Sequence, residues 1–155
     1  MKQIFYLLVF SLISFSSAAK VTDFSGTWNL NKDKSTLNDQ FSMAPKQIIL
    51  IQNNDGLAVE RHGSFQDQDY TINDKFTLDG KECINAGWMD TQKKSTAAWS
   101  SDEKSLTITS KIPMQDGGEM TINETYQTEE NNLKIVVKVS SSFGDVTETY
   151  LFEKQ

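Results

Sequence analysis

Cysteine, histidine and arginine each occur only once in this chain of 155 residues, as Cys83, His62 and Arg61. A single cysteine excludes an intramolecular disulfide. One cysteine and one histidine fall short of the roughly four ligands of a structural zinc site, and neither has an adjacent partner that predicts nucleophilic catalysis. The sequence therefore indicates no metal and no cofactor, and we predict that the chain is not an enzyme.

A calcium loop is also missing. The segment Gln66–Asp74, with the sequence QDQDYTIND, gathers several oxygen ligands. It lacks the glycine and the distal glutamate that such a loop requires. We interpret this segment as a solvated turn.

Long apolar runs are absent except at the beginning of the chain. Lys2 precedes an apolar run from Ile4 to Phe15, and small residues follow it at positions 17–19. This three-part pattern is typical of a secretory signal peptide, and the run is shorter than the roughly 20 residues of a membrane-spanning helix. We predict a signal peptide over residues 1–19, a single domain over 20–155, no stable membrane insertion, and a secreted or periplasmic location.

Basic residues are outnumbered by acidic ones, which gives the chain a formal charge of −6 at neutral pH. An acidic protein repels the phosphates of nucleic acids and of anionic lipid surfaces. We therefore expect no nucleic-acid partner.

A long helical pattern is missing from residues 20–155. Short runs of alternating apolar and polar residues take its place, separated by turn signals such as Asp79-Gly80. Regular short spacing is typical of an antiparallel up-and-down meander, and closing such a sheet into a barrel removes its two exposed edges. We predict an all-β barrel of eight to ten strands from ten candidate ranges: 26–31, 46–52, 57–63, 70–78, 82–88, 92–99, 105–112, 119–128, 133–140 and 146–153.

One segment, Lys32–Ala44, interrupts this rhythm, because it is too long for a hairpin turn. It is polar apart from a few apolar residues and is followed by Pro45. Two interpretations stay open. It forms either a short helix over one mouth of the barrel or an irregular wrap around that mouth.

The first predicted strand carries the sequence FSGTWNL, from Phe24 to Leu30. This Gly-x-Trp opening resembles that of the lipocalins and fatty-acid-binding proteins, the calycin-type barrels, and also that of a class of secreted bacterial domains. The resemblance implies that Gly26 and Trp28 lie at a closed end of the barrel, where the tryptophan acts as a plug. It further implies that a basic residue of the last strand, here Lys154, lies across the indole ring, a favourable cation–π contact.

Arg61 is the residue most open to a functional interpretation, because it alternates with Leu57 and Val59 and so shares their predicted inward face. A buried charge needs a partner, and Glu124 and Glu148 are the candidates. In one interpretation Arg61 receives a ligand carboxylate, as the resemblance to fatty-acid-binding proteins implies, with Tyr126 or Tyr150 assisting. In the other, a buried Arg–Glu pair fixes the strand register.

These observations favour a secreted protein that binds a small hydrophobic or lipid-like molecule, including an acidic one. The alternative is a structural or protein-interaction module of the cell envelope with a packed interior. A third and weaker interpretation is an enzyme that uses the inward Glu, Arg and Tyr side chains on a lipid or a sugar.

The signal peptide is directly testable. We expect protein exported by its own host to begin at Lys20, because the small residues before it form the cleavage site. N-terminal sequencing of the exported protein checks this. A chain that retains Met1 would contradict the prediction.

Overall fold

The computed structural model describes residues 21–39, 42–87 and 90–155, so the predicted signal peptide lies outside the described residues. Every predicted strand range overlaps an observed strand, and together the strands form one ten-stranded sheet. The strands are β1 (Gly26–Leu30), β2 (Gln47–Gln52), β3 (Gly56–Phe65), β4 (Gln68–Thr77), β5 (Cys83–Ala86), β6 (Gln92–Trp99), β7 (Ser105–Pro113), β8 (Glu119–Glu129), β9 (Asn132–Ser141) and β10 (Gly144–Lys154).

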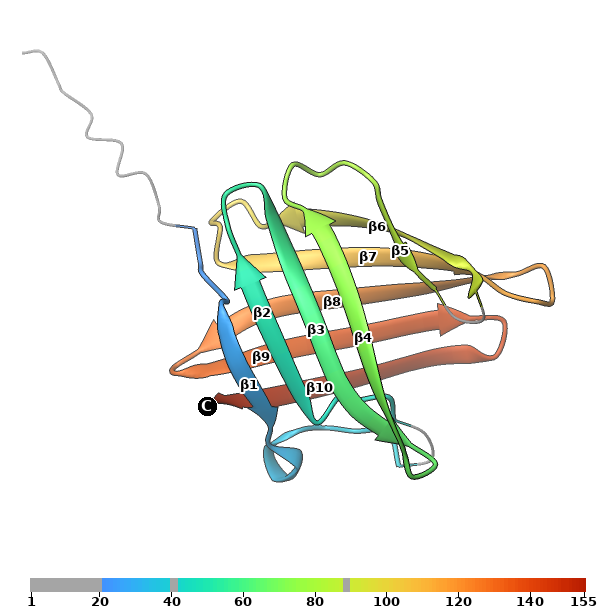
Figure 1. The fold of residues 1–155 in the computed structure, drawn as a ribbon, viewed down its shortest axis with the longest axis horizontal. Helices are drawn as coiled ribbons and strands as arrows, with labels where there is room; N and C mark the ends of the chain where they lie inside the picture. The colour runs from blue at the N-terminus through green and yellow to red at the C-terminus, as the bar shows by residue number, and fades with distance from the viewer. Residues whose placement is uncertain (1–20, 40–41, 88–89) are drawn as a thin grey trace, which may run out of the picture.

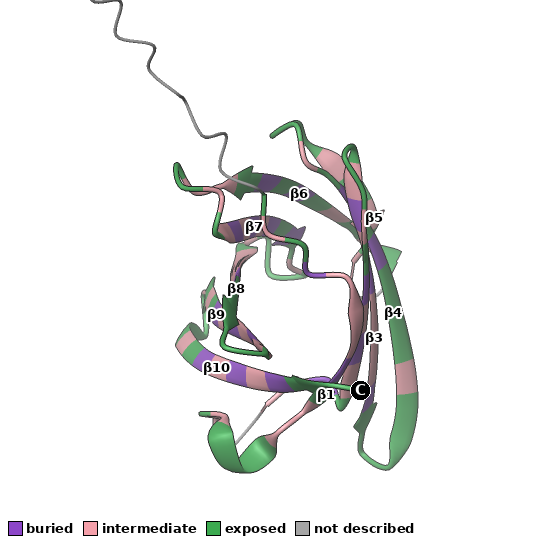
Figure 2. Cartoon of the chain, turned by 90° about the vertical axis from the view of Figure 1, so that its left-hand side faces the viewer, coloured by how far each residue is buried: buried purple, intermediate pink, exposed green. Residues whose placement is uncertain are grey.

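The sheet runs in the order β4-β3-β2-β1-β10-β9-β8-β7-β6-β5, and all paired strands are antiparallel. Strand β1 joins the two halves of the chain, because it pairs with both β2 and β10 (Figure 1). In the view of Figure 2 the sheet curls on itself, with β3 and β4 in one wall and β7 to β10 in the other. The predicted antiparallel up-and-down barrel is thus confirmed.

Closure of the barrel differs from the prediction. Strands β4 and β5 are the ends of the sheet, and no backbone ladder joins them in the described part of the chain. The side chain of Asn85 takes the place of a ladder: its Oδ1 accepts from Lys75 N at 2.8 Å and its Nδ2 donates to Lys75 O at 3.0 Å. The expectation that closure removes both edges is therefore wrong, because a side chain rather than a neighbouring strand covers the edge of β4.

The core fills the barrel from the end at which β1 begins. Inward residues of most strands are fully buried there, as their alternation with outward polar residues requires. They include Leu50, Leu57, Phe76, Leu106, Tyr126, Leu133 and Phe152, and Phe24, just before β1, is buried with them. We call this region the packed end, and the opposite end, with the turns after β3, β7 and β9, the open end.

The segment between β1 and β2 runs past the open end. It begins with a single 3-10 turn, η1 (Lys32–Lys34), and its other described residues have no regular helix. Polar contacts hold it to the barrel: Asn38 N donates to Glu148 Oε1 at 2.7 Å, and Tyr70 OH donates to Met43 O at 3.3 Å. The described parts of Lys32–Ala44 thus follow the irregular interpretation, while residues 40–41 lie outside the description. No helix of the described ranges is long and apolar enough to cross a membrane.

The Gly-x-Trp opening lies at the packed end. Trp28 is buried, its Nε1 donates to Phe24 O at 3.0 Å, and Lys154 Nζ lies 5.2 Å from the centre of its ring. Gly26 has a φ of +147°, and a methyl group at this position would lie 3.0 Å from Lys154 Cε and 3.3 Å from Trp28 Nε1. Only glycine combines that backbone conformation with the close approach of the lysine and the indole.

Replacement of Gly26 by alanine tests this arrangement. We expect the free energy of unfolding to fall by about 2–4 kcal/mol, because backbone strain adds to overpacking. Gly80→Ala is the matched control: Gly80 also has a positive φ, +75°, but nothing lies within 4 Å of an added methyl group. We expect a loss of about 1 kcal/mol there. Urea unfolding of both variants measures the difference, and equal losses would show that crowding around Trp28 is unimportant.

Candidate functional site

A network of charged side chains crosses the interior between the packed end and the open end. Arg61, on β3, is its centre and is only 12% exposed. Its Nη1 donates to Asp74 Oδ2 at 2.7 Å. Its Nη2 lies 3.0 Å from both carboxylate oxygens of Glu124 and 2.9 Å from the hydroxyl of Tyr126.

A second cation meets the same carboxylate. Lys93, on β6, places Nζ 2.7 Å from Asp74 Oδ2 and is 13% exposed, whereas the Asp74 side chain is fully buried. Lys93 and Asp74 lie on opposite sides of the gap between β4 and β5. The ion pair therefore supports the closure that Asn85 provides nearby.

Strand register explains how these residues meet. Arg61 lies opposite Ile72 on β4, so Asp74 follows two residues later on the same inward face. Glu124 lies between Ile108 on β7 and Val137 on β9, which are both buried inward residues. Period-two alternation thus directs all of these charges inward.

Charge and burial set the protonation states of the network. Burial alone would lower the pKa of Arg61, but the nearby charge of Glu124, followed by Tyr126 and Asp74, raises it above its ordinary value. Burial raises the pKa of Tyr126 and of Tyr150, and the hydrogen bond to Glu148 raises that of Tyr150 further. Arg61 therefore stays charged and both phenols stay protonated at neutral pH.

The structure brings together only part of the site expected from the sequence. Of the two candidate partners of Arg61, Glu124 contacts it and Glu148 does not. Instead Glu148 is buried and accepts from Tyr150 OH at 2.6 Å and from Asn38 N. Tyr126 contacts Arg61, whereas the Tyr150 hydroxyl donates to Glu148. Glu148 was thus a wrong partner, because its hydrogen bonds go to its own strand and to the segment after β1.

Two members of the network were missed by sequence reasoning, Asp74 and Lys93. The interpretation of Gln66–Asp74 as a solvated turn is wrong: only Gln66 and Asp67 lie in the turn, and β4 begins at Gln68. A signal was present, because Asp74 alternates with the apolar Phe76 and so shares its face.

Apolar side chains on the inward face become accessible towards the open end. Ile72 is 38% exposed and Phe65 is 37% exposed, although both share the inward register of Arg61. Ile122 and Val139, which face each other on β8 and β9, are only partly buried. The inner wall beyond the charged network is therefore apolar and in contact with solvent.

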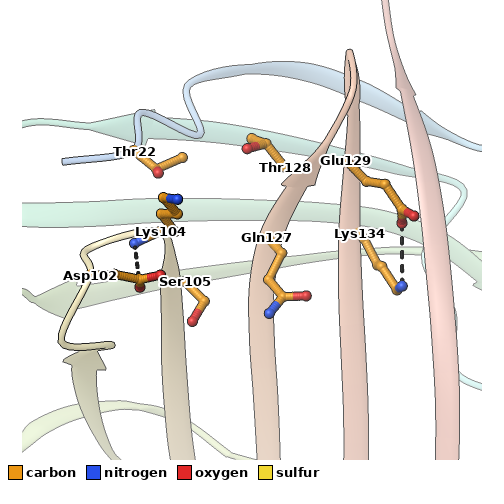
Figure 3. A pocket seen from close by; sticks show the side chains of 8 residues that line it. All are labelled: Thr22, Asp102, Lys104, Ser105, Gln127, Thr128, Glu129 and Lys134. Carbon is orange, nitrogen blue, oxygen red and sulfur yellow. Dashed lines mark hydrogen bonds and ion pairs between the residues drawn. The ribbon is translucent and has the colours of Figure 1, made fainter. Parts of the chain in front are cut away.

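Two hollows lie on the outer surface. One, of about 400 Å³, lies at the packed end (Figure 3) and is lined by Thr22, Asp102, Lys104, Ser105, Gln127, Thr128, Glu129 and Lys134. The other, of about 390 Å³, continues over β9 and β10 beside Leu151. Both are bordered mainly by polar and charged side chains, including the ion pair of Lys134 with Glu129 at 3.2 Å. This chemistry is unlike the apolar lining that small-molecule sites usually have.

Comparison with solved structures places this barrel among known ones. The chain superposes on the crystal structure of zebrafish ileal bile acid-binding protein complexed with cholic acid with a TM-score of 0.59 and 15% identity, covering 85% of this chain and 98% of that one. The two chains share one fold, an antiparallel and nearly closed ten-stranded barrel. The fatty-acid-binding protein isolated from Manduca sexta also matches, with a TM-score of 0.47 and 16% identity over 84% of this chain and 99% of that one.

No protein-family model and no curated protein matches the sequence. The structural likeness to the bile acid-binding protein nevertheless confirms the calycin-type architecture that the Gly-x-Trp opening implies.

Removal of the central cation tests the network. Arg61→Met leaves two carboxylates in the interior with one fewer cation, and we expect a loss of about 3–5 kcal/mol in the free energy of unfolding. Lys34→Met is the control, because Lys34 forms an exposed ion pair with Glu153 at 3.1 Å. That change should cost at most about 1 kcal/mol. Chemical denaturation compares the two variants, and a small loss for Arg61→Met would contradict a structural role of the network.

Proposed function

We propose that this protein binds a small, largely apolar molecule on the inward surface of its open end. The observation that carries the proposal is the exposure of inward apolar residues there, above all Ile72 and Phe65. Exposed apolar surface inside a concave fold is the usual lining of a ligand site. The fold likeness to a barrel crystallised with cholic acid supports this interpretation.

The proposal includes no catalytic step. Histidine and cysteine often provide such a step, but here the only residue of each type contacts other groups of the protein. His62 lies on the outward face, where Nε2 is 2.6 Å from Glu60 Oε1 and Nδ1 is 3.1 Å from Thr71 Oγ1. Cys83 Sγ donates to Ser95 O at 3.3 Å. Together with the predicted export, these contacts favour an extracytoplasmic carrier over an enzyme.

A fluorescence titration tests the proposal. Nile red, an uncharged dye that brightens in apolar surroundings, should bind the purified protein with saturation. Ile72→Asn should weaken binding about tenfold, since a polar amide replaces apolar lining. Ile51→Asn is the matched control, because Ile51 is 64% exposed on the outward face of β2. We expect no change for that variant.

Two results would overturn the proposal. The first is no saturable binding of Nile red, which would favour the packed envelope module. The second is equal weakening by Ile51→Asn and Ile72→Asn, which would place the dye outside the barrel. If Nile red does bind inside the barrel, solvent extraction of protein from its own host, followed by mass spectrometry, identifies the natural ligand.

A further inference from the structure

We propose that the polar end of the ligand is a hydrogen-bond donor without negative charge, and that the site discriminates against carboxylates. This inference rests on the proposed function, since it concerns the polar end of the same binding surface. It follows from how the charged network distributes its donors and acceptors.

Both cations of the network are already paired with carboxylates. Arg61 uses Nη1 on Asp74 and Nη2 on Glu124 and Tyr126. Lys93 places its ammonium group on Asp74 Oδ2. A ligand carboxylate would compete with Asp74 and Glu124 for cations whose charge is already paired, and weakening either pair leaves a buried carboxylate without its full counter-charge.

The net charge of the interior also opposes an anion. Two cations, Arg61 and Lys93, meet two carboxylates, Asp74 and Glu124. Glu148 adds a third buried carboxylate, whose named hydrogen bonds come from uncharged donors, the Tyr150 hydroxyl and the Asn38 amide. The two carboxylates of the network thus balance its two cations, and no positive charge is left in excess. An added anion gains no compensating charge, and a poorly solvated interior strengthens its repulsion by the carboxylates.

One buried acceptor of the network also favours a donor. Asp74 Oδ1 is buried and has no hydrogen-bond partner in the described part of the protein, while Oδ2 of the same carboxylate accepts from two cations. A buried acceptor without a partner is costly, and a donor satisfies it. A hydroxyl or an amine meets this requirement, and a carboxylate does not.

Three ligands with the same alkyl chain test the inference: dodecanol, dodecylamine and dodecanoate. At about pH 8 they are uncharged, cationic and anionic, respectively. Each competes with Nile red for the wild-type protein. We expect dodecanoate to bind at least about tenfold more weakly than dodecanol because of charge repulsion. Dodecylamine should bind at least as well as dodecanol, and the comparison of these two distinguishes a cationic from an uncharged natural head group.

Substitution of the carboxylates gives a second readout. Asp74→Asn removes one negative charge and releases Lys93, so the affinity for dodecanoate relative to dodecanol should rise at least about fivefold. If Asp74→Asn fails to fold, Glu124→Gln on a different strand replaces it, and we expect the same rise in the affinity ratio. Asp69→Asn is the matched control, because Asp69 is 88% exposed on the same strand as Asp74. It should leave the ratio unchanged.

The possible failures are distinguishable. Dodecanoate that binds as tightly as dodecanol, or an unchanged ratio in both folded carboxylate variants, would overturn the donor assignment while ligand binding stands. The same conclusion holds if Nile red binds and none of the three compounds displaces it. If calorimetry detects neither the dye nor any of the three compounds, the proposed function and this inference fail together.

Discussion

The closure of this barrel depends on one buried carboxylate. Asp74 belongs to β4, one end of the sheet, and its Oδ2 binds Lys93 from β6 near the other end. The same oxygen binds Arg61, which reaches across the interior to Glu124 on β8. Because no ladder joins β4 to β5 in the described residues, these contacts and Asn85 connect the two walls. A buried pair adds little net stability but is costly to break, so the network favours the closed arrangement over an open sheet.

The interior divides into two regions on either side of this network. On one side, Phe24 and Trp28 complete a core of buried apolar residues. On the other side, Ile72 and Phe65 share the inward register and yet remain accessible. Stability therefore resides in the packed end, and this leaves the open end free to present apolar surface without unfolding the barrel.

Much of this architecture could be predicted from local pattern. Leu57 and Val59 were assigned to the inward face by alternation, and both are buried. The same rule placed Arg61 inward. It did not identify the missing ladder, because periodicity describes each strand and does not state which edges pair. Asp74 was missed for a related reason: it fell within both the predicted strand 70–78 and the segment interpreted as a turn, and its partners, Arg61 and Lys93, are brought near only by folding.

The choice between Glu124 and Glu148 shows a limit of local sequence. Both occur in nearly the same context, NETY and TETY, and both point inward. Glu124 lies across the barrel from Arg61, whereas Glu148 lies within reach of Tyr150 and of the segment that follows β1. Their different partners come from their positions around the barrel, which only the complete sheet order defines. The sheet order therefore decides which carboxylate the arginine meets, and under the proposed function the same few charges select the polar group of the ligand. In this chain the sole arginine, Arg61, is paired with the carboxylates of Asp74 and Glu124.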